Sequence, residues 1–188
     1  MPDSESGRTR DVSPVFDRRA FRQTVGQFVT GVTVIVTEID GQIRAMTANS
    51  FTSLSLEPPL VLCCVGKGTN TGRVIQSAAG FSVNILSQGQ QALSTYFAGG
   101  WTEPQPPAFS FVKWMGGPRL DGCGAALGCA IESIHEGGDH WIVIGRVLDV
   151  YRSDGSHAPL VFFAGRYTTV RPAPQAETPD LTYLISGF

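Results

Sequence analysis

Apolar and polar residues alternate with a period of two over much of this chain, which is the pattern of half-buried β-strands. The first clear case is "GVTVIVTEIDGQIRAMT", whose alternating valines lead to Asp40-Gly41, a dipeptide typical of hairpin turns. A second hairpin is predicted over residues 124–151, where two Ile- and Val-rich runs flank a glycine-containing loop. Further strands are expected at 60–65, directly after Pro58-Pro59, and at 81–86.

Three short helices are predicted from capping residues and from a period of 3.6. Asp17 can cap the first, and Thr69 or Asn70 can cap a second that ends at about residue 79. Ser87 and Gln90 have the spacing of a capping box for a third, which ends before Gly99-Gly100. The apolar residues on one face of the first helix are Phe21, Val25, Phe28 and Val29.

Many short strands with few short helices indicate a mainly β fold, either a barrel or a sandwich. The strands do not alternate regularly with helices, which argues against a Rossmann sheet. We expect residues 1–14 to be a disordered tail, 15–170 to form one domain and 171–188 to be a C-terminal extension. The Pro- and Gly-rich stretch 101–122, with several aromatic residues, is expected to be a long loop that covers part of the domain.

Composition narrows the class of protein. A hydrophobic fraction of 42% with 16% charged residues is typical of a globular domain, and is apolar enough for a large subunit interface. The net charge of −2 and the absence of a basic run argue against nucleic acid as a partner. The polar N-terminus does not resemble a secretory signal, and no apolar run approaches membrane-spanning length, so we expect a cytoplasmic protein without a membrane partner.

The four cysteines show no metal or disulfide pattern. Cys63 and Cys64 are adjacent in a predicted strand, so their side chains point to opposite faces. Cys123 and Cys129 lie six residues apart, and no CxxC occurs. We interpret all four as free thiols in a reducing compartment.

The segment "HEGGDH" at 135–140 has the composition of a metal site without its spacing. Zinc-binding HExxH helices place two histidines four positions apart on one face, whereas His135 and His140 are five apart with Gly137-Gly138 between them. A glycine pair costs roughly 2 kcal/mol of helix propensity relative to alanine. We therefore predict a hairpin turn with no metal ligands, and a metal-dependent hydrolase stays the less favoured alternative.

Two polar segments are candidate ligand sites. "GKGTNT" (66–71) places Lys67 and two threonine hydroxyls between a strand and a predicted helix start, which suits an anion, although a capped helix with a solvated lysine explains it as well. "TANSFTSLS" (47–55) offers many donors and acceptors, which suit a planar heteroaromatic ligand, and an ordinary edge strand is the alternative. "GCGAALG" (122–128) fails as a dinucleotide fingerprint because it leads into a strand.

Several motifs together resemble one family. "FVTGVTVIVT", "MTANSFTSLSLEPPLVLCCV", "FSVNIL", "PRLDG", "GGDHWIVIGRV" and "GRY" occur over residues 17–170 in the order seen in the short-chain flavin reductases, the reductase partners of two-component flavin-dependent monooxygenases. The resemblance implies a homodimer with a split, Greek-key antiparallel β-barrel. It also implies that NADH or NADPH reduces FAD or FMN, and that the reduced flavin diffuses to a separate monooxygenase.

The resemblance implies site residues as well. His140, in the "GGDH" motif, is expected to orient NAD(P)H on the flavin, with Arg166 and Tyr167 completing the same pocket, whereas His135 is interpreted as an ordinary surface residue. Phe97 is expected near the flavin, and Cys64, Lys67, Asn70 and Thr71 are expected near its phosphate. The residues expected to hold the isoalloxazine ring and the ribityl chain are Thr47, Ala48, Asn49, Ser50, Ser53, Leu54 and Ser55.

The sequence gives weaker grounds for choosing the flavin and the nicotinamide nucleotide than for choosing the family. We expect FAD with FMN as the alternative, because the loop 101–122 is available near the site, and NADH rather than NADPH, because no evident arginine cluster awaits a 2′-phosphate. A flavin store or redox sensor without NAD(P)H turnover is the main alternative function. A β-rich interaction module without a small ligand is a further alternative, against which the polar segment 47–55 argues.

Overall fold

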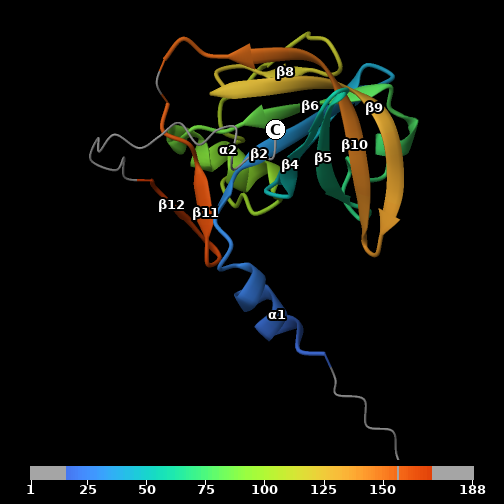
Figure 1. The fold of residues 1–188 in the computed structure, drawn as a ribbon. Coiled ribbons are helices and arrows are strands. Elements are labelled where there is room, and N and C mark those ends of the chain that lie inside the picture. Colours follow the sequence, from blue (N-terminus) through green and yellow to red (C-terminus); the bar gives the residue numbers. More distant parts are fainter. Residues whose placement is uncertain (1–15, 156, 171–188) are drawn as a thin grey trace, which may run out of the picture.

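The computed structural model describes residues 16–155 and 157–170 (Figure 1). The expectations for the N-terminal tail 1–14 and the extension 171–188 lie outside the described residues. The helical elements are α1 (Arg18–Val25), η1 (Ile75–Ser77), η2 (Gln88–Gln90) and α2 (Gln91–Phe97). The strands are β1 (Thr30–Gly31), β2 (Thr33–Ile39), β3 (Gln42–Ala48), β4 (Phe51–Leu56), β5 (Pro59–Gly66), β6 (Gly80–Ile85), β7 (Phe111–Val112), β8 (Arg119–Leu120), β9 (Ala125–Gly137), β10 (His140–Arg152), β11 (Val161–Phe163) and β12 (Arg166–Thr168).

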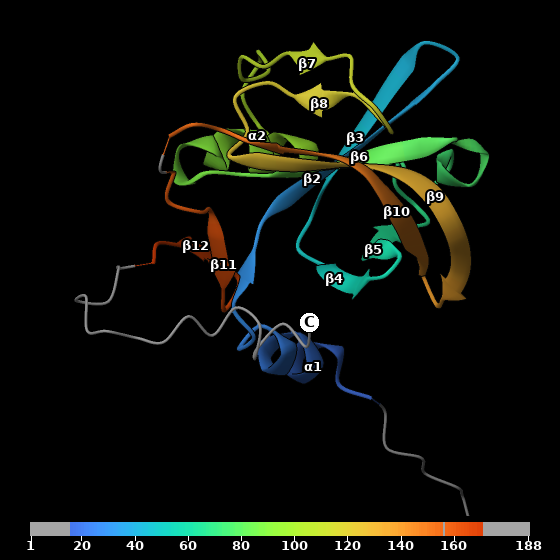
Figure 2. The same cartoon turned by 45° about the horizontal axis from the view of Figure 1, so that its top comes forward.

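Seven strands form the main sheet, in the order β3-β2-β6-β9-β10-β5-β4, and every pairing is antiparallel. Its two edge strands, β3 and β4, are joined by only Asn49 and Ser50, so the sheet curls until its edges approach each other (Figure 2). The Ser50 hydroxyl donates to the Cys64 carbonyl at 3.0 Å and accepts from the Cys64 N–H at 3.2 Å, which holds this corner against β5. The expected mainly β, antiparallel barrel is confirmed.

The core lies on both faces of β2. Val34, Ile35 and Val36 are each 0% exposed, so this strand is covered on both sides rather than half-buried as the alternation of its valines suggested. Ile35 faces the barrel interior together with Phe81 and Val143. The opposite face packs beneath α2 and the neighbouring strands, through Val32, Val34, Val36, Leu86, Leu93, Leu120, Cys123, Ala126 and Leu160.

The two predicted hairpins are present. Asp40 and Gly41 have φ values of 52° and 71°, the left-handed pair that a tight two-residue hairpin turn requires. The β9–β10 hairpin turns at Gly138-Asp139, with His140 paired to Gly137. Gly138 has a φ of 67°, which explains why glycine occupies that position of the "HEGGDH" segment.

Of the predictions for the second and third helices, one is confirmed and one is wrong. The capping box is confirmed, since Ser87 and Gln90 cap the short helix η2, which leads into α2. The helix predicted from Thr69 or Asn70 to residue 79 is wrong: this stretch contains turns and only the short η1. Thr69 does form a cap-like turn, because its hydroxyl accepts from Gly72 N–H at 2.9 Å and donates to the Gly66 carbonyl at 2.8 Å.

The aromatic loop expected at 101–122 crosses the outer face of β6 and β9. A Cβ on Gly116 would lie 2.3 Å from the Cys129 nitrogen, and one on Gly128 would lie 2.1 Å from the Met115 oxygen. Backbone therefore lies directly on backbone at this crossing, which only glycine permits. This contact explains Gly128, the last glycine of "GCGAALG", better than a phosphate-binding motif does.

Helix α1 stands apart from the barrel (Figure 1). Asp17 caps it as predicted, accepting hydrogen bonds from the backbone N–H groups of Arg19 at 2.8 Å and Ala20 at 3.1 Å. The helix buries none of its residues. Within the described part of the chain, no helix is long and apolar enough to cross a membrane.

Candidate functional site

A hollow of about 680 Å³ opens where α1, the β3–β4 corner and β5 approach one another. Its walls combine apolar side chains, among them Phe51, Leu62 and Phe162, with polar groups of Asn49 and Ser50. The Asn49 side-chain amide donates to the Thr30 hydroxyl at 3.1 Å, which orients it along one edge of the hollow. An apolar-walled hollow of this size with polar groups at its edge is typical of a site for a flat heterocyclic ligand.

A smaller hollow adjoins the first at Asn49 and continues along the inner side of α2. Thr47 and Ala48 line it together with Tyr167. The Tyr167 and Ser94 hydroxyls lie 2.8 Å apart, and the Thr47 hydroxyl donates to the Ser94 carbonyl at 2.7 Å. The predicted residues Thr47, Ala48, Asn49 and Tyr167 are thus brought together, although Asn49 and Tyr167 are far apart in the sequence.

A third hollow continues past Ala98 to the turn that follows β5. Phe97, Thr69 and Asn70 line it together with Arg44 of β3. Phe97 therefore lies beside one residue of the predicted phosphate segment. Arg44, which we did not predict, supplies a guanidinium at this end of the groove.

Two other residues predicted for the phosphate point elsewhere. The Lys67 ammonium lies 3.3 Å from a Glu136 carboxylate oxygen and 4.3 Å from the centre of the Trp141 ring, so it is directed at the β9–β10 hairpin. Thr71 is fully buried, and its hydroxyl has no hydrogen-bond partner among the described residues.

The far half of the polar segment is also separated from the hollows. Thr52 is the last residue of β4 that lines the first hollow, and Ser53, Leu54 and Ser55 continue along the strand away from it. Leu54 is 45% exposed. Arg166 lies at the start of β12 with an exposed side chain.

His140 lies on the face of the sheet that bears Cys64, which lines the first hollow. Ile142 pairs with Cys64 and His140 pairs with Gly66, so His140 and Cys64 project from the same face, about 7 Å apart along the strands. A Cβ on Gly66 would lie 3.7 Å from His140 Nε2, so the imidazole lies over a position that has no side chain of its own. The side chain is half exposed, at 47%.

Asp139 orients this imidazole. Nδ1 of His140 lies 2.7 Å from a carboxylate oxygen of Asp139, which leaves Nε2 free to meet a ligand. The hydrogen bond from His140 holds the pKa of Asp139 below its ordinary value, and nearby Arg18 on α1 adds to the effect.

The other histidine of the hairpin and the cysteines lie outside this arrangement. His135 is exposed, and its Nε2 contacts the Ser133 hydroxyl at 3.0 Å. Over residues 16–155 and 157–170, His, Cys, Asp and Glu side chains form no group of three that could hold a metal ion. All four cysteines are free, and Cys64 is the one that lines a hollow. Burial raises the pKa of Cys63 and of Cys129 to about 12, so both remain protonated.

The fold agrees with comparisons to known proteins. The description "flavin reductase like domain" belongs to the family model that matches residues 25–171. The chain therefore belongs to this family, as its motifs suggested.

Relatives and solved structures give the same result. The chain is 39% identical over 169 residues to the flavin-dependent monooxygenase reductase subunit HsaB of Rhodococcus jostii, covering 87% of this chain and 83% of the relative. It is 40% identical over 166 residues to an NADH-dependent FAD reductase of Streptomyces globisporus, covering 86% and 89%. Flavin reductase PheA2 superposes with a TM-score of 0.78 at 39% identity, covering 84% of this chain and all of that one. The Streptomyces globisporus NADH:FAD oxidoreductase SgcE6, solved with NAD and FAD fragments, gives 0.74 at 38% identity, covering 86% and 96%.

Sequence reasoning missed several residues of the groove. Phe51 was inside the predicted segment "TANSFTSLS", and its alternation within β4 could have indicated it. Thr30 and Phe162 join the hollow only because β1 pairs with β11, a contact between distant segments that no local pattern reveals. The arginines of "DRRAFRQ" are spaced to gather on one side of α1, so the expectation that the chain has no evident arginine cluster was wrong at this helix.

Proposed function

We propose that this protein is an NAD(P)H-dependent flavin reductase that uses NADH to reduce FAD and supplies the diffusible reduced flavin to a separate monooxygenase. The observation that carries the proposal is the placement of His140 on the same sheet face as Cys64, beside the hollow lined by Asn49 and Ser50. FMN and NADPH are the alternative flavin and nucleotide. The names of the reductases described above support FAD and NADH.

The groove suits a flavin. Its wide part joins apolar walls to the polar groups of Asn49 and Ser50, which fits a ring system with one apolar and one polar edge. Its far end carries Arg44, Thr69 and Asn70, which suit the phosphate at the end of a ribityl chain. A bound flavin supplies the chemistry itself, by accepting a hydride from the nicotinamide.

The chain's own residues are placed to bind the flavin ring and to orient the nicotinamide over it. Asn49 and Ser50 are placed to donate to the polar edge of the ring, where negative charge develops on reduction. His140, held by Asp139, is placed to position the nicotinamide over the ring rather than to exchange a proton with it. The half-exposed His140 and the open hollow leave a path by which reduced flavin can depart.

We also propose that the protein acts in the cytoplasm as a homodimer whose interface includes the apolar side of α1. Phe21 is 52% exposed and Val25 is 51% exposed, and both follow the i, i+4 spacing of one helix face. Beyond the helix, Phe28 and Val29 are 77% and 54% exposed. Apolar side chains gathered in this way are typical of a contact with another protein surface, and a second copy would cover them by an isologous contact.

The test is NADH oxidation by the purified protein, followed at 340 nm with and without added FAD, and repeated with FMN and with NADPH. Rapid oxidation that depends on free flavin is expected, fastest with FAD and NADH. Tight flavin binding without oxidation in any of the four combinations would instead indicate a flavin store or sensor.

A further inference from the structure

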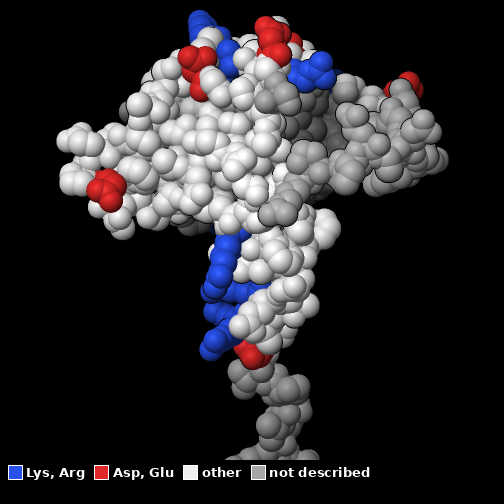
Figure 3. All heavy atoms as spheres, turned by 90° about the vertical axis from the view of Figure 1, so that its left-hand side faces the viewer, with Lys and Arg blue, Asp and Glu red and all other residues white. Residues whose placement is uncertain are grey.

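Helix α1 carries three arginines that border its apolar side. Arg18, Arg19 and Arg22 follow spacings of three and four residues, so they are neighbours on the helix surface. Figure 3 shows Lys and Arg side chains gathered along one side of this projecting helix. Among the described residues, no carboxylate lies within 4.0 Å of any of these guanidinium groups.

Their position on the helix is unfavourable, and in the part of the chain that the structure describes the capping Asp17 carboxylate is the one acidic group that hydrogen bonds hold at this helix start, through the N–H groups of Arg19 and Ala20. Arg18 and Arg19 occupy the first turn, where the helix dipole disfavours positive charge, and that turn contains no acidic residue. Like charges at these spacings also repel one another. A bound anion would relieve both effects at once.

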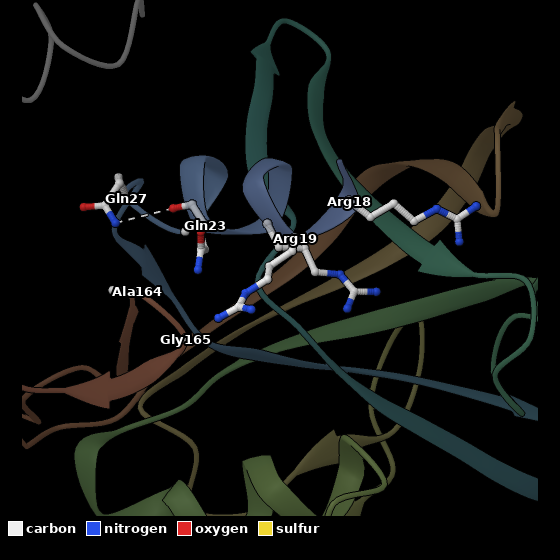
Figure 4. A pocket seen from close by; sticks show the side chains of 8 residues that line it. Arg18, Arg19, Gln23, Gln27, Ala164 and Gly165 are labelled. Atoms are coloured by element: carbon white, nitrogen blue, oxygen red, sulfur yellow. Dashed lines mark hydrogen bonds between the residues drawn. The ribbon is translucent and has the colours of Figure 1, made fainter. Parts of the chain in front are cut away.

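The arginines line a hollow of about 610 Å³ between α1 and the β11–β12 turn. Figure 4 shows Arg19 and Gln23 projecting from the helix on the side where Ala164 and Gly165 lie. The Ala164 N–H donates to the Gly26 carbonyl at 2.8 Å, so the end of the helix is tied to this turn. Glycine at 165, with a φ of 78°, leaves the floor of the hollow free of a side chain.

This hollow continues into the candidate flavin groove. Arg22, Gly26 and Gly165 line both the arginine hollow and the hollow that contains Asn49 and Ser50. At the other end of the helix, the charge of Arg18 contributes to the lowered pKa of Asp139, the residue that holds His140. The basic side of α1 thus adjoins the ring site through Arg22.

We propose that Arg18, Arg19 and Arg22 bind the diphosphate of the nicotinamide dinucleotide while His140 orients its nicotinamide ring. This assignment rests on the proposed function. Arg44 and Asn70 at the opposite end of the groove are available for the flavin phosphate, so α1 is free for the second nucleotide. Guanidinium groups suit a diphosphate because each can donate two parallel hydrogen bonds to its oxygens.

The test compares the full-length protein with the triple variant R18Q/R19Q/R22Q. Glutamine retains helix propensity, and α1 buries no side chain, so the fold is expected to be unaffected. The matched control is Arg152→Gln, which removes an exposed arginine at the end of β10. The probe is ADP-ribose, which carries the diphosphate without the nicotinamide, titrated calorimetrically into the FMN-loaded protein.

ADP-ribose is expected to bind about tenfold more weakly, or worse, to the triple variant and equally well to the control. With FMN as the flavin, the KM for NADH is expected to rise about tenfold with little change in kcat, because the arginines bind the nucleotide away from the reacting ring. The affinities for FMN and FAD are expected to change less than that for ADP-ribose, because Arg22 alone of the three also lines the hollow that contains Asn49 and Ser50.

Equal affinity of the wild type and the triple variant for ADP-ribose would overturn the proposal, as would a wild type that does not bind it. Loss of FAD affinity alone would assign the diphosphate to the flavin and overturn it too. A change confined to the dimer dissociation constant would mean that the arginines serve the subunit contact instead. Failure of the proposed reductase function would give a different result, because the wild type would then oxidise no NADH with either flavin. The ADP-ribose titration would still decide whether the arginines bind a diphosphate.

Discussion

The barrel and helix α1 differ in how far their large side chains are buried. In the barrel, Phe81 and Ile35 are completely buried, and the side chain of Asn84 donates to the Val34 carbonyl and accepts from the Leu120 N–H. On α1, Phe21 and Val25 are about half exposed, and the arginines have no ion-pair partner among the described residues. The barrel buries its large apolar side chains and pairs the amide of Asn84, whereas α1 presents apolar and cationic groups that another molecule can contact. This contrast indicates that stability resides in the barrel and recognition in α1 and the adjoining groove.

The largest expected effect is on the barrel. Phe81→Ala removes a fully buried ring that packs within the core against Gly145, where an added Cβ would lie 2.5 Å from the ring. The free energy of unfolding is expected to fall by about 3–5 kcal/mol, measured by urea denaturation followed by circular dichroism. Phe21→Ala, studied at a concentration where the protein is monomeric, is the control, with an expected change below about 0.5 kcal/mol. Similar losses for the two variants would remove the contrast between barrel and helix.

The next effect concerns the apolar side of α1. Phe21→Glu combined with Val25→Glu places charges in the proposed subunit contact, and the dimer dissociation constant is expected to rise at least about a hundredfold, or about 2.7 kcal/mol. Analytical ultracentrifugation measures it. Thermal unfolding of the monomeric fraction is expected to match that of the wild-type monomer, since neither side chain is buried within the chain. An unchanged oligomeric state would place the contact elsewhere.

A smaller effect is expected at the hairpin turn. His140→Ala is predicted to raise the KM for NADH about tenfold, equivalent to about 1.4 kcal/mol of binding energy, with a loss of kcat if ring alignment suffers. His135→Ala is the matched control, because His135 lies on the same hairpin and contacts only Ser133 in the hydrogen bonds observed for its ring. Steady-state kinetics with FAD measure both variants. If the two behave alike, His140 has no role in the site.

The smallest effect at neutral pH concerns the thiols. The pKa values of Cys63 and Cys129 are raised by burial from the ordinary 9.0 to about 12, so folding favours the protonated thiols. Their contribution to stability is complete below pH 9 and is lost as the pH rises toward 12, because only the unfolded chain ionises there. Unfolding measured between pH 8 and pH 11 is expected to show this decline, with a shallower slope in Cys63→Ala.

Thiol labelling can distinguish the buried core from the groove. At pH 8, the half-buried Cys64 is expected to react with a thiol reagent before the three buried cysteines, and bound flavin is expected to slow that reaction because Cys64 lines the groove. Mass spectrometry of the labelled peptides locates the modified residue. Labelling of Cys63 at a rate equal to that of Cys64 would contradict the burial described for the core.

Local patterns were enough for the elements whose cause is local. Asp40-Gly41, the capping box of Ser87 and Gln90, and the Asp17 cap each depend on a few adjacent residues, and all three are present in the structure. The helix predicted after Thr69 failed because the same capping residue also stabilises a single turn, as the hydrogen bonds of Thr69 to Gly66 and Gly72 show. Capping marks where a helix can begin and does not ensure that it continues.

By itself the sequence determined the mainly β class, the two hairpins and the polar segment at 47–55, because each follows from residue spacing along the chain. Only the tertiary structure decided which of these residues share a groove. Tyr167 meets Thr47 and Ala48 in one hollow although β12 and β3 belong to different sheets, and Thr30 meets Phe162 because β1 pairs with β11. The curl of the sheet separates Ser53 to Ser55 from the hollow while bringing His140 to the same face as Cys64. Such placement depends on strand order and register, which are set by burial over the whole barrel and not by any short segment.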